Sequence, residues 1–152
     1  MGKIIGIDLG TTFSAIAQLD DLGNPEVLAS TDTNKKITSS TVYLKENNVV
    51  VGDKALDGLS ATPKNVVTET KRQMENDVVF STQKGEWIDK EGAEEGCYSP
   101  AQVSSFILGK LKGYTLDVKK AVVTVPALFA EKARVATLDA AKMAGIEVIE
   151  LI

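Results

Sequence analysis

Short hydrophobic runs separated by polar turns fill the first thirty residues and predict β-structure. Residues 3–10 (KIIGIDLG) are a mostly apolar strand that ends in a turn. Residues 13–19 (FSAIAQL) and 25–30 (PEVLAS) follow as two further strands, and the turn signal DDLGN separates them. The pattern therefore predicts a meander of three strands.

The same alternation continues after a polar loop over residues 31–38. Two more strands are predicted at 40–45 (STVYLK) and 48–52 (NVVVG), with Asn47 and Asn48 at a tight hairpin between them.

The region from residue 53 to residue 98 has a mixed pattern. Short helices are predicted over residues 53–59 and 66–74. Residues 77–98 contain scattered charges and three glycines, which is typical of a small peripheral insert with short strands (VVFST and GEWID). Trp87, the single tryptophan, is expected to pack this insert.

The last third of the chain carries clear helix and strand signals. Ser99 and Gln102 form a capping box with Pro100 at the first helical position, and Gly113 can end the helix. The apolar stripe of this helix consists of Val103, Phe106, Ile107 and Leu111.

A strand–helix–strand unit follows this helix. The strand KAVVTVP is stopped by Pro126, a second helix covers residues 130–144, and IEVIELI is a second strand, which predicts a parallel crossover. The fold class is therefore α/β. Because the chain stops at the end of an apolar strand, we expect it to be cut from a longer protein.

Composition excludes several function classes. The 152 residues are 43% hydrophobic with a formal net charge of −4, so a broad basic face for nucleic acid is not expected. There is no histidine and one cysteine, Cys97, which excludes histidine-dependent nucleophiles and cysteine zinc clusters. A general base must be a carboxylate, lysine or tyrosine. No apolar run approaches membrane-spanning length, so we expect a cytoplasmic protein with no membrane partner.

The segment GIDLGTTFS predicts a phosphate-binding turn. Gly10 permits a positive φ and a close backbone approach, and successive amides in such a turn form an anion site to which Thr11 and Thr12 add hydroxyl donors. Asp8 would repel phosphate unless a cation such as Mg²⁺ lies between them. The alternative is a plain hairpin turn with a solvated Asp8. No Walker loop is present.

These residues also carry a family resemblance. MGKIIGIDLGTTFS closely resembles the opening of the DnaK-type heat-shock 70-kDa chaperones, within the actin and hexokinase superfamily. Further similar segments follow in the family's order: VVGDKAL, NVVTETKRQM, YSPAQVSSFILGKLK and AVVTVPALFAEKARVATLDAAKMAGIEVIELI. The resemblance implies a ribonuclease-H-like, actin-type ATPase lobe over residues 1–152, with a mixed sheet flanked by helices and a peripheral subdomain inserted at about residues 35–113.

The resemblance also implies the ligands and the site residues. The ligand would be ATP or ADP with Mg²⁺, and K⁺ is a further candidate ion. Asp8 and Lys71 would be catalytic, with Asp8 holding Mg²⁺ through water. The nucleotide would be bound by Gly10, Thr11, Thr12, Phe13 and Arg72, and its state would be relayed by Pro126 and Arg134.

Plainer interpretations exist for these residues. Lys71 and Arg72 on a polar helix are usually a solvated face, and a proline such as Pro126 ordinarily terminates a strand. Arg134 could pair with Glu131 on its own helix.

The chain also departs from the family pattern. A Gly-Asn-Arg-Thr-Thr-Pro-Ser stretch is replaced by TNKKITSST, with Lys36 in place of the arginine and Ser39 in place of the proline, whereas Thr38 and Ser40 roughly keep the pattern. Residues 77–96 match poorly. The family's second phosphate loop, adenosine pocket and peptide-binding domain would all lie beyond Ile152, so we expect this chain alone to bind nucleotide weakly or not at all.

Three functions remain open. The first is an ATP-dependent chaperone that binds unfolded polypeptides through a further domain, assisted by a J-domain co-chaperone and a nucleotide exchange factor. The second is a sugar or glycerol kinase of the same superfamily, which TETKRQM and VTVPALF disfavour. The third is an actin-like filament protein.

Overall fold

A six-stranded mixed sheet forms the base of the protein. The computed structural model describes residues 3–152, so the first two residues of the opening motif lie outside the described residues. The strand order is β11-β10-β1-β2-β3, with β4 also paired to β2. These strands are β1 (Lys3–Asp8), β2 (Phe13–Leu19), β3 (Pro25–Val27), β4 (Thr38–Ser39), β10 (Val118–Thr124) and β11 (Glu147–Leu151).

Strand direction follows the predicted connections. β1 and β2 pair antiparallel through the turn between them, whereas β1–β10 and β10–β11 are parallel. The helix α3 (Glu131–Met143) connects β10 to β11, as the crossover prediction required. The expected α/β class, a mixed sheet flanked by helices, is confirmed.

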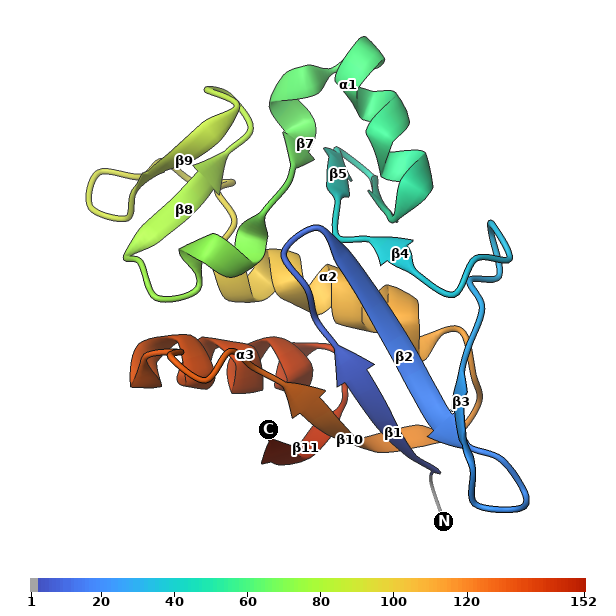
Figure 1. Ribbon diagram of the computed structural model, residues 1–152. Helices are drawn as coiled ribbons and strands as arrows, with labels where there is room; N and C mark the ends of the chain where they lie inside the picture. Colours follow the sequence, from blue (N-terminus) through green and yellow to red (C-terminus); the bar gives the residue numbers. More distant parts are fainter. Residues whose placement is uncertain (1–2) are drawn as a thin grey trace.

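Two helices cover one face of this sheet. α2 (Pro100–Lys112) passes behind β2 in Figure 1 and packs against α3. Ser99 Oγ accepts a hydrogen bond from Gln102 N–H at 3.1 Å, and Gln102 Oε1 accepts one from Ser99 N–H at 2.8 Å, so the capping box is confirmed. The buried core joins the helices to the sheet through Ile5, Ile7, Ile16, Val103, Ile107 and Leu111. Each such burial contributes about 1.5–3 kcal/mol.

A second, smaller part lies above the sheet in Figure 1. Its three-stranded sheet has the order β6-β5-β7, from β5 (Val42–Lys45), β6 (Asn48–Val51) and β7 (Val66–Val67). Short helical turns connect β6 to β7: a 3-10 helix at Asp53–Asp57, α1 (Gly58–Ala61) and a 3-10 helix at Pro63–Asn65. A further 3-10 helix at Thr70–Gln73 follows β7.

The predicted insert is a two-stranded hairpin. β8 (Val78–Ser81) pairs antiparallel with β9 (Glu86–Asp89). Trp87 meets Phe80 edge to face with ring centroids 5.4 Å apart, so the expected packing role of Trp87 is confirmed.

Three local predictions were wrong in detail. The β5–β6 turn consists of Glu46 and Asn47, because Lys45 already pairs with Asn48. The third strand ends at Val27 instead of residue 30. The helix predicted over 66–74 is confined to Thr70–Gln73, because the β-branched pair at its start pairs with β5 as strand β7.

No helix within residues 3–152 is both long enough and apolar enough to cross a membrane.

Candidate functional site

The turn between β1 and β2 is too tight for any residue other than glycine at position 10. A Cβ placed on Gly10 would lie 1.9 Å from the carbonyl oxygen of Phe13. Gly10 is not among the glycines with positive φ, so the turn uses the close approach that we expected and not the left-handed conformation. We call Gly10, Thr11 and Thr12 the phosphate loop.

The amides of this loop have different orientations. Gly10 N–H donates to Ser14 Oγ at 3.2 Å and is therefore turned into the protein. Among the hydrogen bonds of residues 3–152, none uses the N–H of Thr11 or Thr12. These two amides, with their threonine hydroxyls, are the donors that the loop can offer to an anion.

Asp8 stands at the end of β1, close before this loop. Parallel pairing places Thr124, the last residue of β10, opposite Asp8. Thr124 Oγ1 donates to Asp8 Oδ1 at 2.9 Å. The sequence did not single out Thr124, although its position two residues before Pro126, at the end of the parallel strand, was the available signal.

Lys71 lies in the 3-10 turn Thr70–Gln73 and is partly buried. Its Nζ is 5.8 Å from the centroid of the Phe129 ring, a cation–π distance. Burial lowers the pKa of the Lys71 ammonium below its usual value, and the negative charge of Asp8 opposes this shift. The charge of Asp8 therefore acts on Lys71 although 63 positions separate them in the sequence, but the two side chains form no ion pair among those of residues 3–152. Phe129 was also not indicated by the sequence.

A strained residue positions this turn. Glu69 has φ 55° and ψ 32°, the left-handed region that non-glycine residues seldom adopt. Its carboxylate is 3.7 Å from Arg72, whose side chain is 67% exposed. Arg72 therefore lies on the outer side of the turn that carries Lys71.

Thr11 and Thr12 of the phosphate loop and Glu69, two residues before Lys71, line one cavity of about 320 Å³, whereas Asp8, Gly10 and Lys71 are not among its lining residues. Its lining comes from three separate segments: Thr11, Thr12 and Phe13; Ser39, Ser40 and Thr41; and Leu56, Thr68 and Glu69. All of these residues except Phe13 and Leu56 are polar or charged.

Pro126 and Arg134 lie on the connection from β10 into α3. Phe129 N–H donates to the carbonyl oxygen of Pro126 at 3.0 Å, so the residue whose ring faces Lys71 is hydrogen-bonded to Pro126. Arg134 is partly buried on α3, and among the ion pairs of residues 3–152 none contains it. The alternative pairing of Arg134 with Glu131 is thus not formed.

The residues around the loop fit a hydrated divalent cation bound to a phosphate. Thr124 occupies one oxygen of the exposed Asp8 carboxylate, which leaves the other oxygen for a water ligand of the ion. Mg²⁺ usually binds proteins through one or two carboxylates, substrate phosphates and retained waters. Within residues 3–152 there is no group of three or more acidic, cysteine or histidine side chains that could hold a metal.

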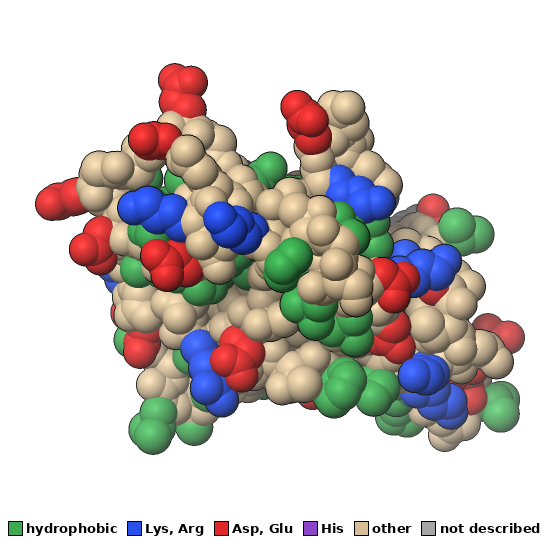
Figure 2. Space-filling view, turned by 90° about the horizontal axis from the view of Figure 1, so that it is seen from above, with side chains coloured by type: hydrophobic (Ala, Val, Ile, Leu, Met, Phe, Trp, Pro, Cys, Tyr) green, Lys and Arg blue, Asp and Glu red, His purple; other side chains and the backbone are tan. Residues whose placement is uncertain are grey.

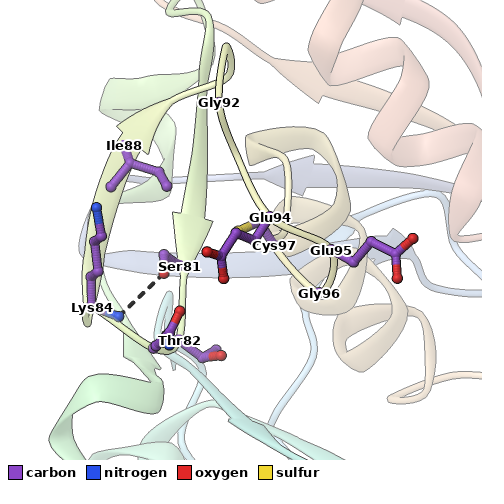
Figure 3. A pocket seen from close by; sticks show the side chains of 10 residues that line it. Ser81, Thr82, Lys84, Ile88, Gly92, Glu94, Glu95, Gly96 and Cys97 are labelled. Atoms are coloured by element: carbon purple, nitrogen blue, oxygen red, sulfur yellow. Dashed lines mark hydrogen bonds between the residues drawn. The ribbon is translucent and has the colours of Figure 1, made fainter.

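Two other cavities of the described residues, of about 540 Å³ each, are larger than the cavity that Thr11 and Thr12 line, and none of the phosphate-loop residues lines them. Acidic and basic side chains are interspersed on the face shown in Figure 2. Cys97 lines a small cavity of about 80 Å³ within the insert, beside Lys84, Glu94 and Glu95 (Figure 3), and none of the phosphate-loop residues borders it.

The family model and the similar proteins that the comparisons found are all Hsp70 or DnaK proteins. A family model described as Hsp70 protein matches residues 4–152. The chain is 39% identical over 163 residues to the chaperone protein DnaK of Nitrosopumilus maritimus (strain SCM1), covering 100% of the chain and 23% of that protein. It is 35% identical over 173 residues to DnaK of Carsonella ruddii (strain PV), covering 100% and 28%. It is 35% identical over 174 residues to DnaK of Buchnera aphidicola subsp. Schizaphis graminum (strain Sg), covering 100% and 26%. The chain spans about a quarter of the length of these relatives.

Proposed function

Because the chain belongs to the Hsp70 family, we propose that it is the first part of the nucleotide-binding domain of an ATP-dependent chaperone. One observation carries this proposal: beside Asp8 at the end of β1, the Thr11 and Thr12 amides have no hydrogen-bond partner among residues 3–152 and are available to bind an anion. The parent protein, meaning the longer protein that we propose contains this chain, would hydrolyse ATP.

We propose Mg²⁺ with ATP or ADP as the ligand of this loop, and K⁺ as a further candidate ion. Gly10, Thr11, Thr12 and Phe13 would surround the terminal phosphates, and Asp8 would hold Mg²⁺ through water. Arg72 would contact the nucleotide from the outer side of its turn. The nucleotide would then replace the exposed contact that Arg72 makes with Glu69.

The residues of this chain would act by positioning and by charge. Phosphoryl transfer needs little covalent help from the protein, and a bound Mg²⁺ supplies neutralisation of phosphate charge. Lys71 would place a positive charge at the terminal phosphate and orient the attacking water. Thr124 would fix the direction of the Asp8 carboxylate through its 2.9 Å hydrogen bond.

We propose that Pro126 and Arg134 transmit the nucleotide state to the rest of the parent. This role is supported by the link from Lys71 through Phe129 to Pro126. We also propose that residues 1–152 are the first lobe and that residues 35–113 are a subdomain inserted in it.

The wider activity belongs to the parent. We propose that it binds and releases unfolded polypeptides in the cytoplasm, with a J-domain co-chaperone and a nucleotide exchange factor as partners, and that it serves under heat-shock and stress conditions.

The test is ATP hydrolysis by the parent and by its Lys71→Ala variant. We expect the variant to lose at least about a hundredfold in kcat, because the lost group is a charge directed at the transition state. Lys142→Ala is the matched control, since Lys142 is an exposed lysine on α3 away from the cavity. Equal rates for the parent and Lys71→Ala would contradict the proposal, and phosphorylation of glycerol or a sugar would favour the kinase alternative.

A further inference from the structure

Four consecutive hydroxyl residues, Thr38, Ser39, Ser40 and Thr41, are buried where the main sheet meets the smaller part; we call them the hydroxyl segment. Their exposed fractions are 4%, 6%, 3% and 4%. Burying a hydroxyl is costly unless it is hydrogen-bonded, so each needs a partner. Within this segment only Ser39 stands where the family pattern has another residue, the proline, and the proposed function gives the segment no role.

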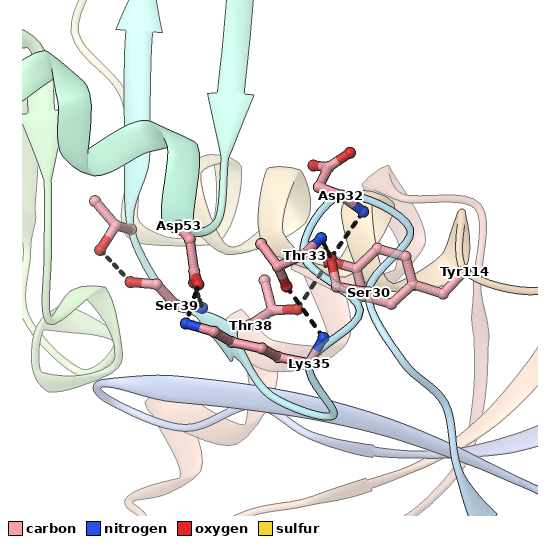
Figure 4. Close-up of polar contacts among 9 residues, drawn as sticks. Ser30, Asp32, Thr33, Lys35, Thr38, Ser39, Asp53 and Tyr114 are labelled. Carbon is pink, nitrogen blue, oxygen red and sulfur yellow. Dashed lines mark hydrogen bonds and ion pairs between the residues drawn. The ribbon is translucent and has the colours of Figure 1, made fainter.

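Most of this segment is held by residues outside the phosphate loop (Figure 4). Thr38 Oγ1 is 2.8 Å from the Tyr114 hydroxyl, just beyond α2. Ser39 N–H donates to Asp53 Oδ1 at 3.1 Å, and Ser39 Oγ is 2.7 Å from Thr41 Oγ1. The hydroxyl segment is therefore hydrogen-bonded to Tyr114 after α2 and to Asp53 in the smaller part, in addition to its contacts with the phosphate loop.

Ser40 makes the connection to the loop. Its Oγ is 2.8 Å from Ser14 Oγ, in a fully buried contact between residues 26 positions apart. Ser40 N–H also donates to the carbonyl oxygen of Thr12 at 2.8 Å. Ser14 Oγ, on a residue that is 1% exposed, accepts the Gly10 N–H. The loop is thus hydrogen-bonded at Gly10 through Ser14 and at Thr12 through Ser40.

This arrangement has a consequence for the anion site. Gly10 has no side chain to restrict its backbone, so the orientation of its peptide must come from hydrogen bonds. With the Gly10 amide held by Ser14, the Thr11 and Thr12 amides are left without a hydrogen-bond partner among residues 3–152. A loop already in its binding geometry does not lose conformational freedom when a phosphate arrives.

We propose that Ser14 and Ser40 are positioning residues that set the geometry of the phosphate loop before nucleotide binds. Neither side chain needs to touch the nucleotide: Ser14 acts through Gly10, and Ser40 holds Ser14 with its hydroxyl and Thr12 with its backbone N–H. This inference rests on the proposed nucleotide-binding function of the loop.

Three variants separate positioning from simple packing: Ser14→Ala, Ser40→Ala and the double variant. Ser14→Ala leaves the buried Ser40 hydroxyl without its partner, and Ser40→Ala leaves the Ser14 hydroxyl with the Gly10 amide alone, so each single variant should lower the unfolding temperature. The double variant removes both hydroxyls and should recover much of that loss. Only Ser14 contacts the Gly10 amide, so the double variant should not recover the loop geometry.

Two measurements read out the loop geometry. Hydrogen exchange of the Gly10 amide, followed by NMR in the 152-residue chain, should accelerate about tenfold or more in Ser14→Ala and in the double variant. The KM of the parent for Mg·ATP should rise about tenfold in the same two variants and less in Ser40→Ala. Ser39→Ala is the control for exchange, because it breaks a buried hydroxyl pair in the same segment without contact to Gly10.

The outcomes are distinguishable. In one outcome, the KM for Mg·ATP and the exchange rate of the Gly10 amide return toward their unmodified values in the double variant, as the unfolding temperature does. The hydroxyl pair is then only a packing contact, and the positioning role is overturned. Unchanged KM in Ser14→Ala of a parent that hydrolyses ATP overturns it as well. If the unmodified parent does not hydrolyse ATP, the proposed function is wrong, and the Ser14–Ser40 pair then has no role in nucleotide binding.

Discussion

At the scale of single residues, the candidate site contains two residues, Lys71 and Glu69, whose surroundings or backbone conformation lower the stability of the folded chain. Lys71 is an ammonium placed in a partly buried position, and Glu69 before it has a left-handed backbone. Such features persist where function requires them, at the expense of the folded state.

The lowered pKa of Lys71 predicts a pH dependence. The folded chain releases this proton below the ordinary value of 10.5, so just below 10.5 the unfolded chain binds more protons and Lys71 makes stability rise with pH. We expect Lys71→Met to abolish that rise in the free energy of unfolding, measured by urea titration across alkaline pH, whereas Lys142→Met retains it. In the parent, ATP hydrolysis should decline over the same pH window because the cation is lost.

Thr124 predicts a loss of catalysis without a loss of fold. Thr124→Val removes the hydrogen bond to Asp8 Oδ1 but keeps the shape of the residue, so kcat/KM for ATP in the parent should fall about tenfold. Thr124→Ser keeps the hydroxyl and should retain most of the activity. Equal losses in both variants would exclude the hydrogen bond as the cause.

Gly10 and Gly6 form a matched pair for the tight turn. A Cβ at Gly10 would collide with the Phe13 carbonyl oxygen, whereas one at Gly6 meets no atom within 4 Å. We expect Gly10→Ala to lower the free energy of unfolding by about 3 kcal/mol and Gly6→Ala to change it by less than about 0.5 kcal/mol. Chemical denaturation of the 152-residue chain measures both.

At the scale of elements, local signals explain the long helices better than the short turns. α2 begins where Ser99 and Gln102 predicted, because a capping box satisfies helix amides through residues three positions apart. Val66 and Val67 form strand β7 and not the start of the predicted helix, because their pairing with β5 outweighs a weak local preference for helix.

The cap itself is testable. Ser99→Ala should lower the free energy of unfolding by about 1 kcal/mol, since the Gln102 amide loses its acceptor. Ser99→Asp keeps an acceptor at the helix start and should be close to wild type in thermal denaturation. A destabilised Ser99→Asp would indicate that packing at this position matters more than capping.

At the scale of the whole molecule, ion pairs join segments that are far apart in the sequence. Lys110 on α2 contacts Asp32 in the loop after β3, and Lys132 on α3 contacts Asp77 before β8, each at 2.5 Å. Their exposure differs: the side chains are 28% and 25% exposed in the first pair, but 51% and 76% in the second. Exposed pairs contribute little because water and salt screen them.

Double-mutant cycles with Lys→Met and Asp→Asn should therefore give a larger coupling for Asp32–Lys110 than for Asp77–Lys132. The hydrogen bond from Lys110 lowers the pKa of Asp32 below 3.8, so the contribution of this pair is present above 3.8 and is lost as pH falls through the lowered value. Measuring the coupling free energy in dilute acid tests the protonation of Asp32, and measuring it at high salt tests the screening of the exposed pair.

The sequence by itself determined the elements that depend on near neighbours. Apolar periodicity located β1, β2, β10 and the two long helices, and the residue types at Asp8, Gly10, Thr11 and Thr12 indicated an anion-binding turn. These signals act over a few positions, so a single sequence contains them.

Only the tertiary structure decided which distant side chains meet. The bonds Thr124–Asp8 and Ser14–Ser40 join residues 116 and 26 positions apart, and both exist because strand order brings β10 beside β1 and β4 beside β2. Strand order results from packing of the whole core, which no local pattern records. The prediction of an anion-binding turn thus came from the sequence alone, whereas the hydrogen bonds that orient the turn were set by the fold.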